Sequence, residues 1–268
     1  MSVPMTPWGA FALAGLRMGF PEDVSTNGWK VDALFEHILL ITGVAFVALE
    51  AILIFFVVKY RAKNGATTVE PSLGKAGILW GGFIGAVALT LIVTEGGTWL
   101  ESSRIQRDKQ AGFPDGPDAF RVEVLAEQFM WNFRYPGPDG KFQTDDDVTS
   151  VGMLRVPVGR PVVLQMHSKD VLHSFYLPNF REKQDVVPGL TNKLWFKAAR
   201  PSLTGADGKK VPWEIMCAEL CGLGHYTMRA FVVAESEEDL AKYLKDQAEY
   251  SNPDDNWGWD WSLGKERR

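Results

Sequence analysis

Two long apolar segments near the N-terminus constrain the fold most strongly. Leu39–Val58 spans twenty residues with Glu50 as its only charge, and Ala76–Thr94 spans nineteen residues with none. A helix needs roughly 20 apolar residues to cross about 30 Å of hydrocarbon. The rest of the chain could hardly cover two such helices in a soluble core. We therefore predict a transmembrane helical hairpin within residues 34–100.

The charges beside these segments predict their orientation. The connecting loop carries four basic residues against one acid, whereas residues 1–33 are acidic on balance where they approach the first span. Because basic loops stay in the cytoplasm, we expect both ends of the chain on the outer, periplasmic face. The N-terminal residues lack a basic start and match a cleaved signal peptide poorly. The net charge of −5 argues against nucleic acid as a partner and suits an outer face that receives a basic protein.

A polar stretch follows the second span and leads into a β-rich region. Residues 101–119 are rich in charge, Gly and Pro, and we predict a linker there. Within 120–235, short β-like runs alternate with turn residues, as in a β-sandwich. In 236–268, Ser236 and the acids after it match a capping box, which predicts a helix to about Ala248. The tail beyond it carries three tryptophans, which we expect to serve docking rather than chemistry.

The stretch Cys217–Met228 (CAELCGLGHYTM) is the one segment whose composition points to a chemistry. It holds both cysteines of the chain together with His225 and a methionine. Thiolate and thioether sulfur are soft donors that select copper over hard cations. A disulfide is one alternative. Structural zinc is another, although it has no use for the methionine, and a mononuclear copper site leaves Cys221 unexplained.

A metal bound by this loop needs a further ligand from another strand. The chain has three other histidines, of which His37 lies at the mouth of the first span and out of reach. His167 and His173 both lie on strand-like runs. His173 is followed by an apolar run that ends at Pro178, which suits a buried ligand, so we favour it. We expect His167 to point to solvent or to satisfy a local hydrogen bond.

The loop resembles the C-x-E-x-C-x3-H-x2-M motif of subunit II of the haem–copper cytochrome c oxidases. Further segments resemble that family in the family's order: Gln128–Tyr135 (QFMWNFRY), Asp170–Phe175 (DVLHSF), and Lys183-x-Asp185 followed by Pro188-Gly189. The two-span hairpin resembles it too, so the likeness covers about residues 30–235. The resemblance implies a transmembrane hairpin joined to an all-β cupredoxin-like Greek-key sandwich.

The resemblance also implies a dinuclear copper centre, CuA, on this chain. The thiolates of Cys217 and Cys221 would bridge both coppers. His173 and His225 would each bind one copper, and Met228 would be a weak further ligand.

Two more implications of the resemblance concern metals and haem. Glu219 would bind copper through its backbone carbonyl, and its side chain would bind a magnesium or manganese ion shared with the catalytic subunit. The sequence has no C-x-x-C-H motif, so we expect no haem on this chain.

The function that the resemblance implies is electron transfer in a terminal respiratory oxidase. The chain would accept electrons from cytochrome c on the periplasmic side of a bacterial inner membrane. It would pass them to haem in a catalytic partner subunit, which reduces oxygen to water. Two alternatives stay open: the CuA subunit of a related nitric oxide reductase, and a membrane-anchored copper chaperone. Two tightly held coppers indicate the carrier, and one labile copper indicates the chaperone.

The sequence departs from the family at the residue through which electrons usually enter. The family commonly has a tryptophan two positions before a second tryptophan. Here Phe129 holds the first position and Trp131 the second, and we treat both as candidates for electron entry. We expect acids such as Glu123 and Asp170 either to contribute negative docking surface or to be simply solvated.

Overall fold

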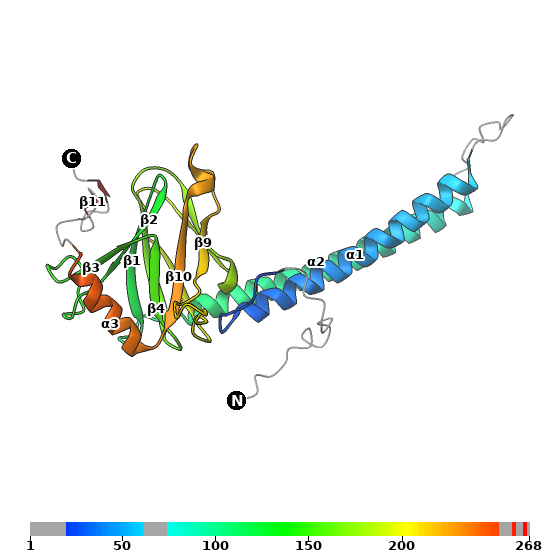
Figure 1. Cartoon of the computed structure of the whole chain (residues 1–268). Helices are drawn as coiled ribbons and strands as arrows, with labels where there is room; N and C mark the ends of the chain where they lie inside the picture. The colour runs from blue at the N-terminus through cyan, green and yellow to red at the C-terminus, as the bar shows by residue number, and fades with distance from the viewer. Residues whose placement is uncertain (1–19, 62–73, 252–258, 261–264, 267–268) are drawn as a thin grey trace. The chain divides into compact units, whose positions relative to one another are not determined.

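The computed structural model describes residues 20–61, 74–251, 259–260 and 265–266 (Figure 1). They fall into two compact units, one helical and one rich in β-strands. Most of the basic loop between the spans and most of the tryptophan-rich tail lie outside the described residues, as do residues 1–19.

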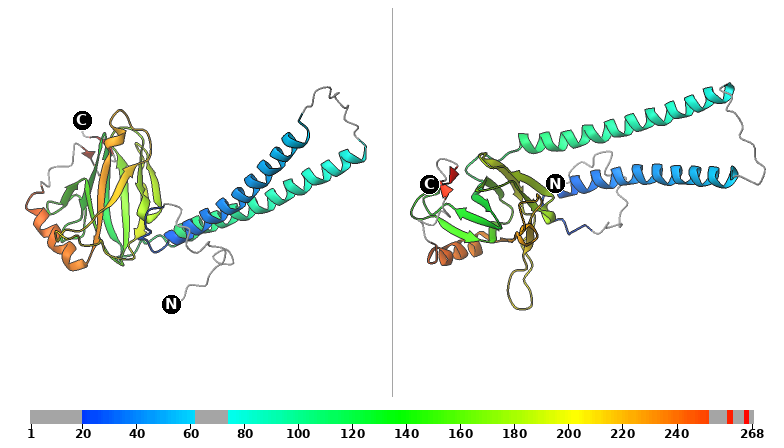
Figure 2. Two further views of the ribbon diagram at one scale, coloured as in Figure 1. Left: turned by 45° about the vertical axis from the view of Figure 1, so that its right-hand side comes forward. Right: turned by 90° about the horizontal axis from the view of Figure 1, so that it is seen from above.

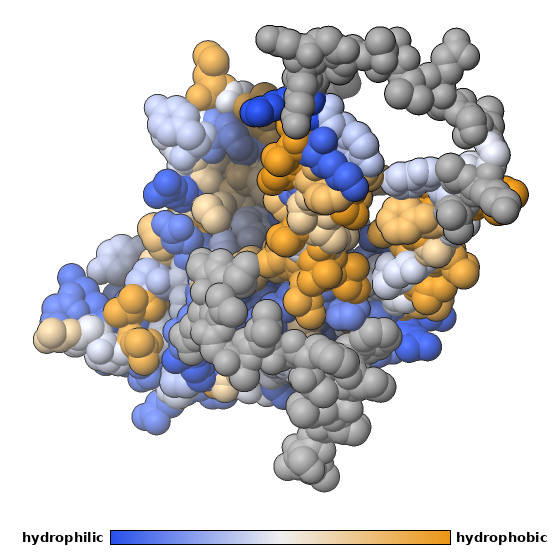
Figure 3. Space-filling model, turned by 90° about the vertical axis from the view of Figure 1, so that its right-hand side faces the viewer, coloured by the Kyte–Doolittle hydropathy of each residue, from blue (hydrophilic) through white to orange (hydrophobic). Residues whose placement is uncertain are grey.

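The helical unit consists of α1 (Gly28–Lys59) and α2 (Lys75–Ala111). The two helices run in opposite directions in both views of Figure 2. Both are long and apolar enough to cross a membrane, and their apolar stretches are not buried within the chain. Figure 3 shows the hydrophobic side chains that these helices expose. At 1.5 Å per residue α1 is about 48 Å long, longer than the ~30 Å hydrocarbon core.

Helix α2 continues into the segment predicted as a linker. Its last turns are polar and contain Glu101 and Arg104, which form an ion pair at 3.4 Å one turn apart. Glutamate, arginine, lysine and glutamine are good helix formers, so the helix persists until Gly112, which follows its last residue.

The β-rich unit is a sandwich of two five-stranded sheets. The first sheet has the strand order β3 (Val148–Val151), β2 (Met130–Tyr135), β1 (Phe120–Glu127), β5 (Pro161–Ser168) and β8 (Asn192–Lys197). The second has the order β4 (Met153–Pro157), β10 (Arg229–Glu235), β9 (Trp213–Cys217), β6 (His173–Leu177) and β7 (Glu182–Val186). The pairs β1–β5 and β4–β10 are parallel, and the other pairs in these sheets are antiparallel. The predicted all-β sandwich is confirmed.

The hydrophobic core lies between the two sheets. Alternate residues of each strand point to the same face, so Val122, Val124 and Ala126 of β1 enter the core together. From the second sheet, Phe175 and Leu177 of β6 are fully buried in the same cluster. Each of the valine, phenylalanine and leucine side chains among them contributes roughly 1.5–3 kcal/mol by leaving water, and together they hold the two sheets against each other.

A short segment before α1, Pro21–Thr26, is also part of the β-rich unit. The Val24 N–H donates to the carbonyl of Asn179 at 2.9 Å, and the Ala199 N–H donates to the carbonyl of Val24 at 2.8 Å. The Val24 side chain is 1% exposed and belongs to the core. This contact could not be expected from the sequence, because a single valine between Asp23 and Ser25 shows no periodicity.

The C-terminal helix α3 (Glu237–Ala248) begins at a capping box. The Ser236 hydroxyl accepts a hydrogen bond from the Asp239 N–H at 3.1 Å. Leu240 is buried, and the Tyr243 hydroxyl donates to Ser150 of β3 at 3.2 Å. The helix therefore packs against the sandwich at β3 and β4. Two short strands, β11 (Trp259–Asp260) and β12 (Lys265–Glu266), pair with each other beyond it.

A charged cluster is buried on the first sheet. Glu123 of β1 lies opposite Arg134 of β2, and Arg134 forms an ion pair with Asp147 at 3.2 Å. Glu123 is only 6% exposed, so our expectation that it is solvated or contributes docking surface is wrong. Burial raises the pKa of Glu123 from 4.5 to about 7; Arg134 opposes this rise, and Asp147 adds to it.

We predict that Glu123→Gln flattens the pH dependence of folding stability. In the native chain Glu123 holds its proton up to about pH 7, whereas the unfolded chain releases it near pH 4.5. Stability is therefore lost as pH rises between these values, by on the order of 3 kcal/mol. Urea unfolding of the detergent-solubilised chain at pH 5 and pH 8 measures this loss. If the free energy of unfolding falls equally between pH 5 and pH 8 in the unaltered chain and in Glu123→Gln, Glu123 does not titrate in this pH range.

Candidate metal centre

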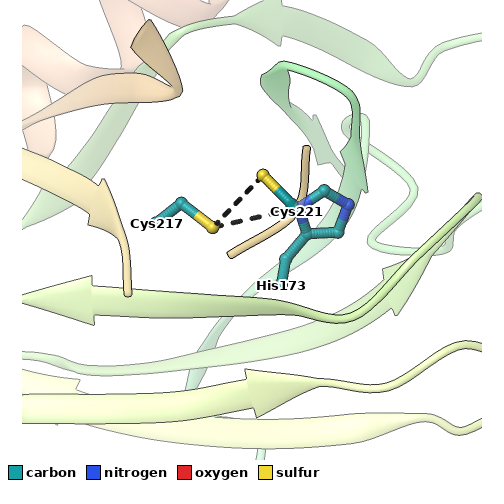
Figure 4. Close-up of side chains that lie close together, drawn as sticks. All are labelled: His173, Cys217 and Cys221. Carbon is teal, nitrogen blue, oxygen red and sulfur yellow. Dashed lines mark hydrogen bonds between the residues drawn. The ribbon is translucent and has the colours of Figure 1, made fainter. Parts of the chain in front are cut away.

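The pairing of two strands and one loop brings the predicted ligands together. His173 is the first residue of β6, and Cys217 is the last residue of the neighbouring strand β9. Cys221 and His225 follow in the loop that leads to β10, with His225 opening a short 3₁₀ helix, η3 (His225–Thr227). Figure 4 shows His173, Cys217 and Cys221 converging on one point.

Neighbouring donor atoms of the site lie close together. The Cys217 Sγ is 3.9 Å from the Cys221 Sγ and 3.9 Å from Nδ1 of His173. The Cys221 Sγ is 3.5 Å from Nδ1 of His225 and 3.6 Å from Sδ of Met228. The ligand atoms of His173, Cys217 and Cys221 all lie within 4.8 Å of one another, and His225 and Met228 add two further donor atoms beside Cys221.

The two thiols are not joined as a disulfide. A disulfide bond is about 2.05 Å long, and the sulfurs are 3.9 Å apart. Two sulfurs that share a tetrahedral metal with bonds of about 2.3 Å lie roughly 3.8 Å apart. The observed spacing therefore fits a shared metal, and the disulfide alternative fails in this structure.

Asp170 fixes the orientation of the His173 ring. The Asp170 carboxylate contacts Nε2 of His173 at 2.7 Å, which leaves Nδ1 directed toward the Cys217 sulfur. Its other oxygen accepts a hydrogen bond from the Gln128 N–H at 2.7 Å. Metal-binding histidines commonly donate their second ring nitrogen to a carboxylate in this way.

The electrostatics of the site favour one thiolate before any metal binds. Burial acts to raise the pKa of Cys217, but hydrogen bonds with His173 and nearby backbone outweigh it and lower the pKa to about 6. Burial and the negative charge of Cys217 raise the pKa of Cys221 to about 11. The second thiol therefore gives up its proton when a metal binds.

Glu219 faces the site with its backbone. Its carbonyl oxygen lies 3.2 Å from the Cys217 Sγ, and its side chain is exposed. The carbonyl of Glu219 therefore lies at the candidate site, while its side chain is open to solvent.

Neither aromatic candidate for electron entry is a fully exposed ring. Trp131 is completely buried, with its ring centroid 6.0 Å from the His173 ring and 5.0 Å from that of Phe175. A partner protein cannot touch it directly. Phe129 is half-buried, and its ring lies against Gly222 and Gly224. Both glycines belong to the segment from Cys217 to Met228, which we call the metal loop.

His167 lies apart from the site. It belongs to β5 in the first sheet, whereas His173 and Cys217 belong to β6 and β9 of the second. It is 7% exposed, so of our two expectations, solvent or a local hydrogen bond, the first is wrong; burial lowers its pKa. Asp170 is exposed, in line with our expectation of docking surface or solvation, and it also contacts His173.

Comparison with known proteins identifies the family. The family model "Cytochrome C oxidase subunit II, periplasmic domain" matches residues 121–236. The alternative cytochrome c oxidase subunit 2 of Bradyrhizobium diazoefficiens is 30% identical over 251 residues, which cover 85% of this chain and 84% of that protein. Cytochrome c oxidase subunit 2 of Synechocystis is 27% identical over 264 residues, which cover 84% and 74%.

A solved structure is also similar. The crystal structure of the periplasmic domain of subunit II of cytochrome oxidase from Bradyrhizobium japonicum is 26% identical. The match covers 49% of this chain and 94% of that chain, with a TM-score of 0.41.

The fold and these matches define a class: membrane-anchored oxidase subunits with a periplasmic, cupredoxin-like domain. More particularly, the chain belongs to the family of subunit II of the cytochrome c oxidases. Its role is thus that of a subunit in an oxidase complex with a catalytic partner, and family membership supports electron transfer as its task. The resemblance inferred from the sequence is confirmed.

We predict that Asp170→Asn weakens copper binding by about 10–100-fold, because loss of a carboxylate behind a metal-binding histidine has this typical effect. Competition with a chelator of known affinity measures it. The matched control is Asp207→Asn, since Asp207 accepts only a backbone hydrogen bond from Lys209 in an exposed loop. Unchanged affinity in Asp170→Asn would show that the His173 contact does not orient the ring.

Proposed function

We propose that this chain carries a dinuclear CuA centre through which an oxidase receives electrons one at a time. The observation that carries this proposal is the convergence of two thiols, two imidazoles and a thioether, with neighbouring donors 3.5–3.9 Å apart. Such a set is soft, and soft sites with thiolate and thioether ligands select copper.

Each ligand has its own part in this proposal. The thiolates of Cys217 and Cys221 would hold the two coppers together with the imidazoles of His173 and His225. Met228 and the backbone carbonyl of Glu219 would be weak further ligands. When bound, the two coppers supply a site that takes up and gives away a single electron.

The residues around the ligands support such a carrier. Asp170 holds the ring of His173 in place. Met228 and Trp131 are almost fully buried, so water has little access to the centre from the sandwich side. A rigid, dry ligand set changes little in shape when its charge changes, and this favours rapid electron transfer.

The direction of electron flow follows from the family. We propose that a periplasmic cytochrome c is the donor and that a haem in the catalytic subunit is the acceptor, where oxygen is reduced to water. The membrane is a bacterial inner membrane, and the two apolar helices anchor the chain in it. The exposed side chain of Glu219 is our proposed ligand for a magnesium or manganese ion shared with the catalytic subunit.

The test is copper content together with low-temperature electron paramagnetic resonance of the purified full chain. We expect two coppers per chain and an unpaired electron coupled equally to both nuclei. Cys217→Ser should remove this signal, because one bridging sulfur is lost. The control is Thr204→Ala, at an exposed position in the loop between β8 and β9, which should leave the signal unchanged.

Other outcomes point to other functions. One labile copper with single-nucleus splitting, or a signal that survives Cys217→Ser, would instead indicate a membrane-anchored copper chaperone. If the dinuclear signal is present, turnover with oxygen and with nitric oxide in the assembled complex separates an oxidase from a nitric oxide reductase.

A further inference from the structure

The turn between β1 and β2, residues Gln128 and Phe129, lies against the metal loop. It makes contacts with both parts of the chain that carry ligands. The Gln128 N–H donates to Asp170, which in turn contacts His173. The Gln128 side-chain amide donates to the backbone carbonyl of Cys221. One residue therefore links the strand that begins with His173 to the loop that carries Cys221.

The Phe129 ring covers the next part of the loop. A methyl group added at Gly224 would lie 2.7 Å from Cε2 of Phe129, and one added at Gly222 would lie 3.2 Å from Cε1 and Cζ. Real Cβ atoms essentially never lie closer than 3.0 Å to another heavy atom. The ring thus rests directly on backbone at two positions that lack a side chain.

The backbone conformation of Gly222 is a second constraint that favours glycine at this position. Its φ is +137°, a conformation that residues with a Cβ rarely adopt. At Gly224 the backbone conformation is ordinary, with φ −90°, so the space taken by Phe129 is the constraint there. The fit between Phe129 and Gly224 is therefore specific to this pair of residues.

We propose that Phe129 is a positioning residue: its ring clamps the Cys221–His225 loop, and packing rather than aromatic character is what the site requires of it. The inference deepens the proposed function and rests on it for the identity of the metal. It also accounts for a phenylalanine where the family commonly has tryptophan. The six-membered ring of Phe129 covers Gly222 and Gly224, so the larger ring of tryptophan is not needed to hold the loop.

Three variants of the full chain test the clamp. Phe129→Ala removes the ring, Phe129→Leu keeps apolar bulk without an aromatic ring, and Phe120→Ala is the matched control. Phe120 is, like Phe129, a partly buried phenylalanine packed against the core, but it lies at the opposite end of β1. The readouts are the rate of copper loss to a chelator and the electron paramagnetic resonance spectrum.

We expect Phe129→Ala to lose copper about tenfold faster than the unaltered chain, the lower end of what loss of a supporting contact costs a metal site. Phe129→Leu and Phe120→Ala should stay close to the unaltered chain. If Phe129→Ala retains copper as well as Phe120→Ala does, the clamp is refuted. If Phe129→Leu keeps copper but accepts electrons from a reduced cytochrome c as slowly as Phe129→Ala, the ring is an electron path and the inference fails.

A double-variant comparison tests the contact itself. Gly224→Ala should speed copper loss in the unaltered chain, because its methyl group collides with the ring. The same change should cost much less in Phe129→Ala, where the ring is absent, since residues in contact are non-additive. Gly116→Ala is the control, because nothing lies within 4 Å of an added methyl group there. Additive effects would overturn the proposed contact.

These experiments separate the clamp from the proposed function. If the unaltered chain binds no dinuclear copper, the proposed function fails. The clamp is then tested on the metal-free chain by thermal unfolding, in which Gly224→Ala should still lower the midpoint less in the Phe129→Ala background. If the unaltered chain binds two coppers and the comparison is additive, the clamp alone fails.

Discussion

The antiparallel pairing of β6 with β9 is the interaction on which the candidate metal centre depends. Phe175 lies opposite Cys217, so the strand that begins with His173 runs beside the strand that ends with Cys217. Phe175 itself is buried in the core, where its ring packs edge-on against that of Trp131. The distance between the first thiol and the first imidazole is therefore set by the sandwich, and the remaining donors follow within one short loop.

Local features of the chain could be predicted from the sequence. The two spans follow from length and composition, since few other structures accommodate twenty apolar residues. The closeness of the side chains between Cys217 and Met228 follows from their short spacing in the sequence, and the start of α3 follows from a serine and the acids beside it. In each case the residues that carry the signal are neighbours in the sequence.

Contacts between distant residues could not be predicted in this way. The bond from Gln128 to the Cys221 carbonyl joins residues 93 apart, and the bond from Gln128 to Asp170 joins residues 42 apart. The burial of Glu123 and His167 was missed for a related reason. Strand alternation places them on the outer face of the first sheet, but it does not tell whether that face is covered.

The segment around Val24 limits how the chain can thread through a membrane. Val24 precedes α1, yet its backbone bonds with Asn179 and Ala199 in the sandwich. Both partners must therefore be on the same side of the membrane for the core to close. The chain between them must cross the bilayer an even number of times, and the pair α1 and α2 meets this requirement. The position of Val24 in the sandwich therefore requires that both helices insert or that neither does. If only one helix inserted, Val24 and its partners would lie on opposite sides of the membrane and the β-sandwich would stay incomplete.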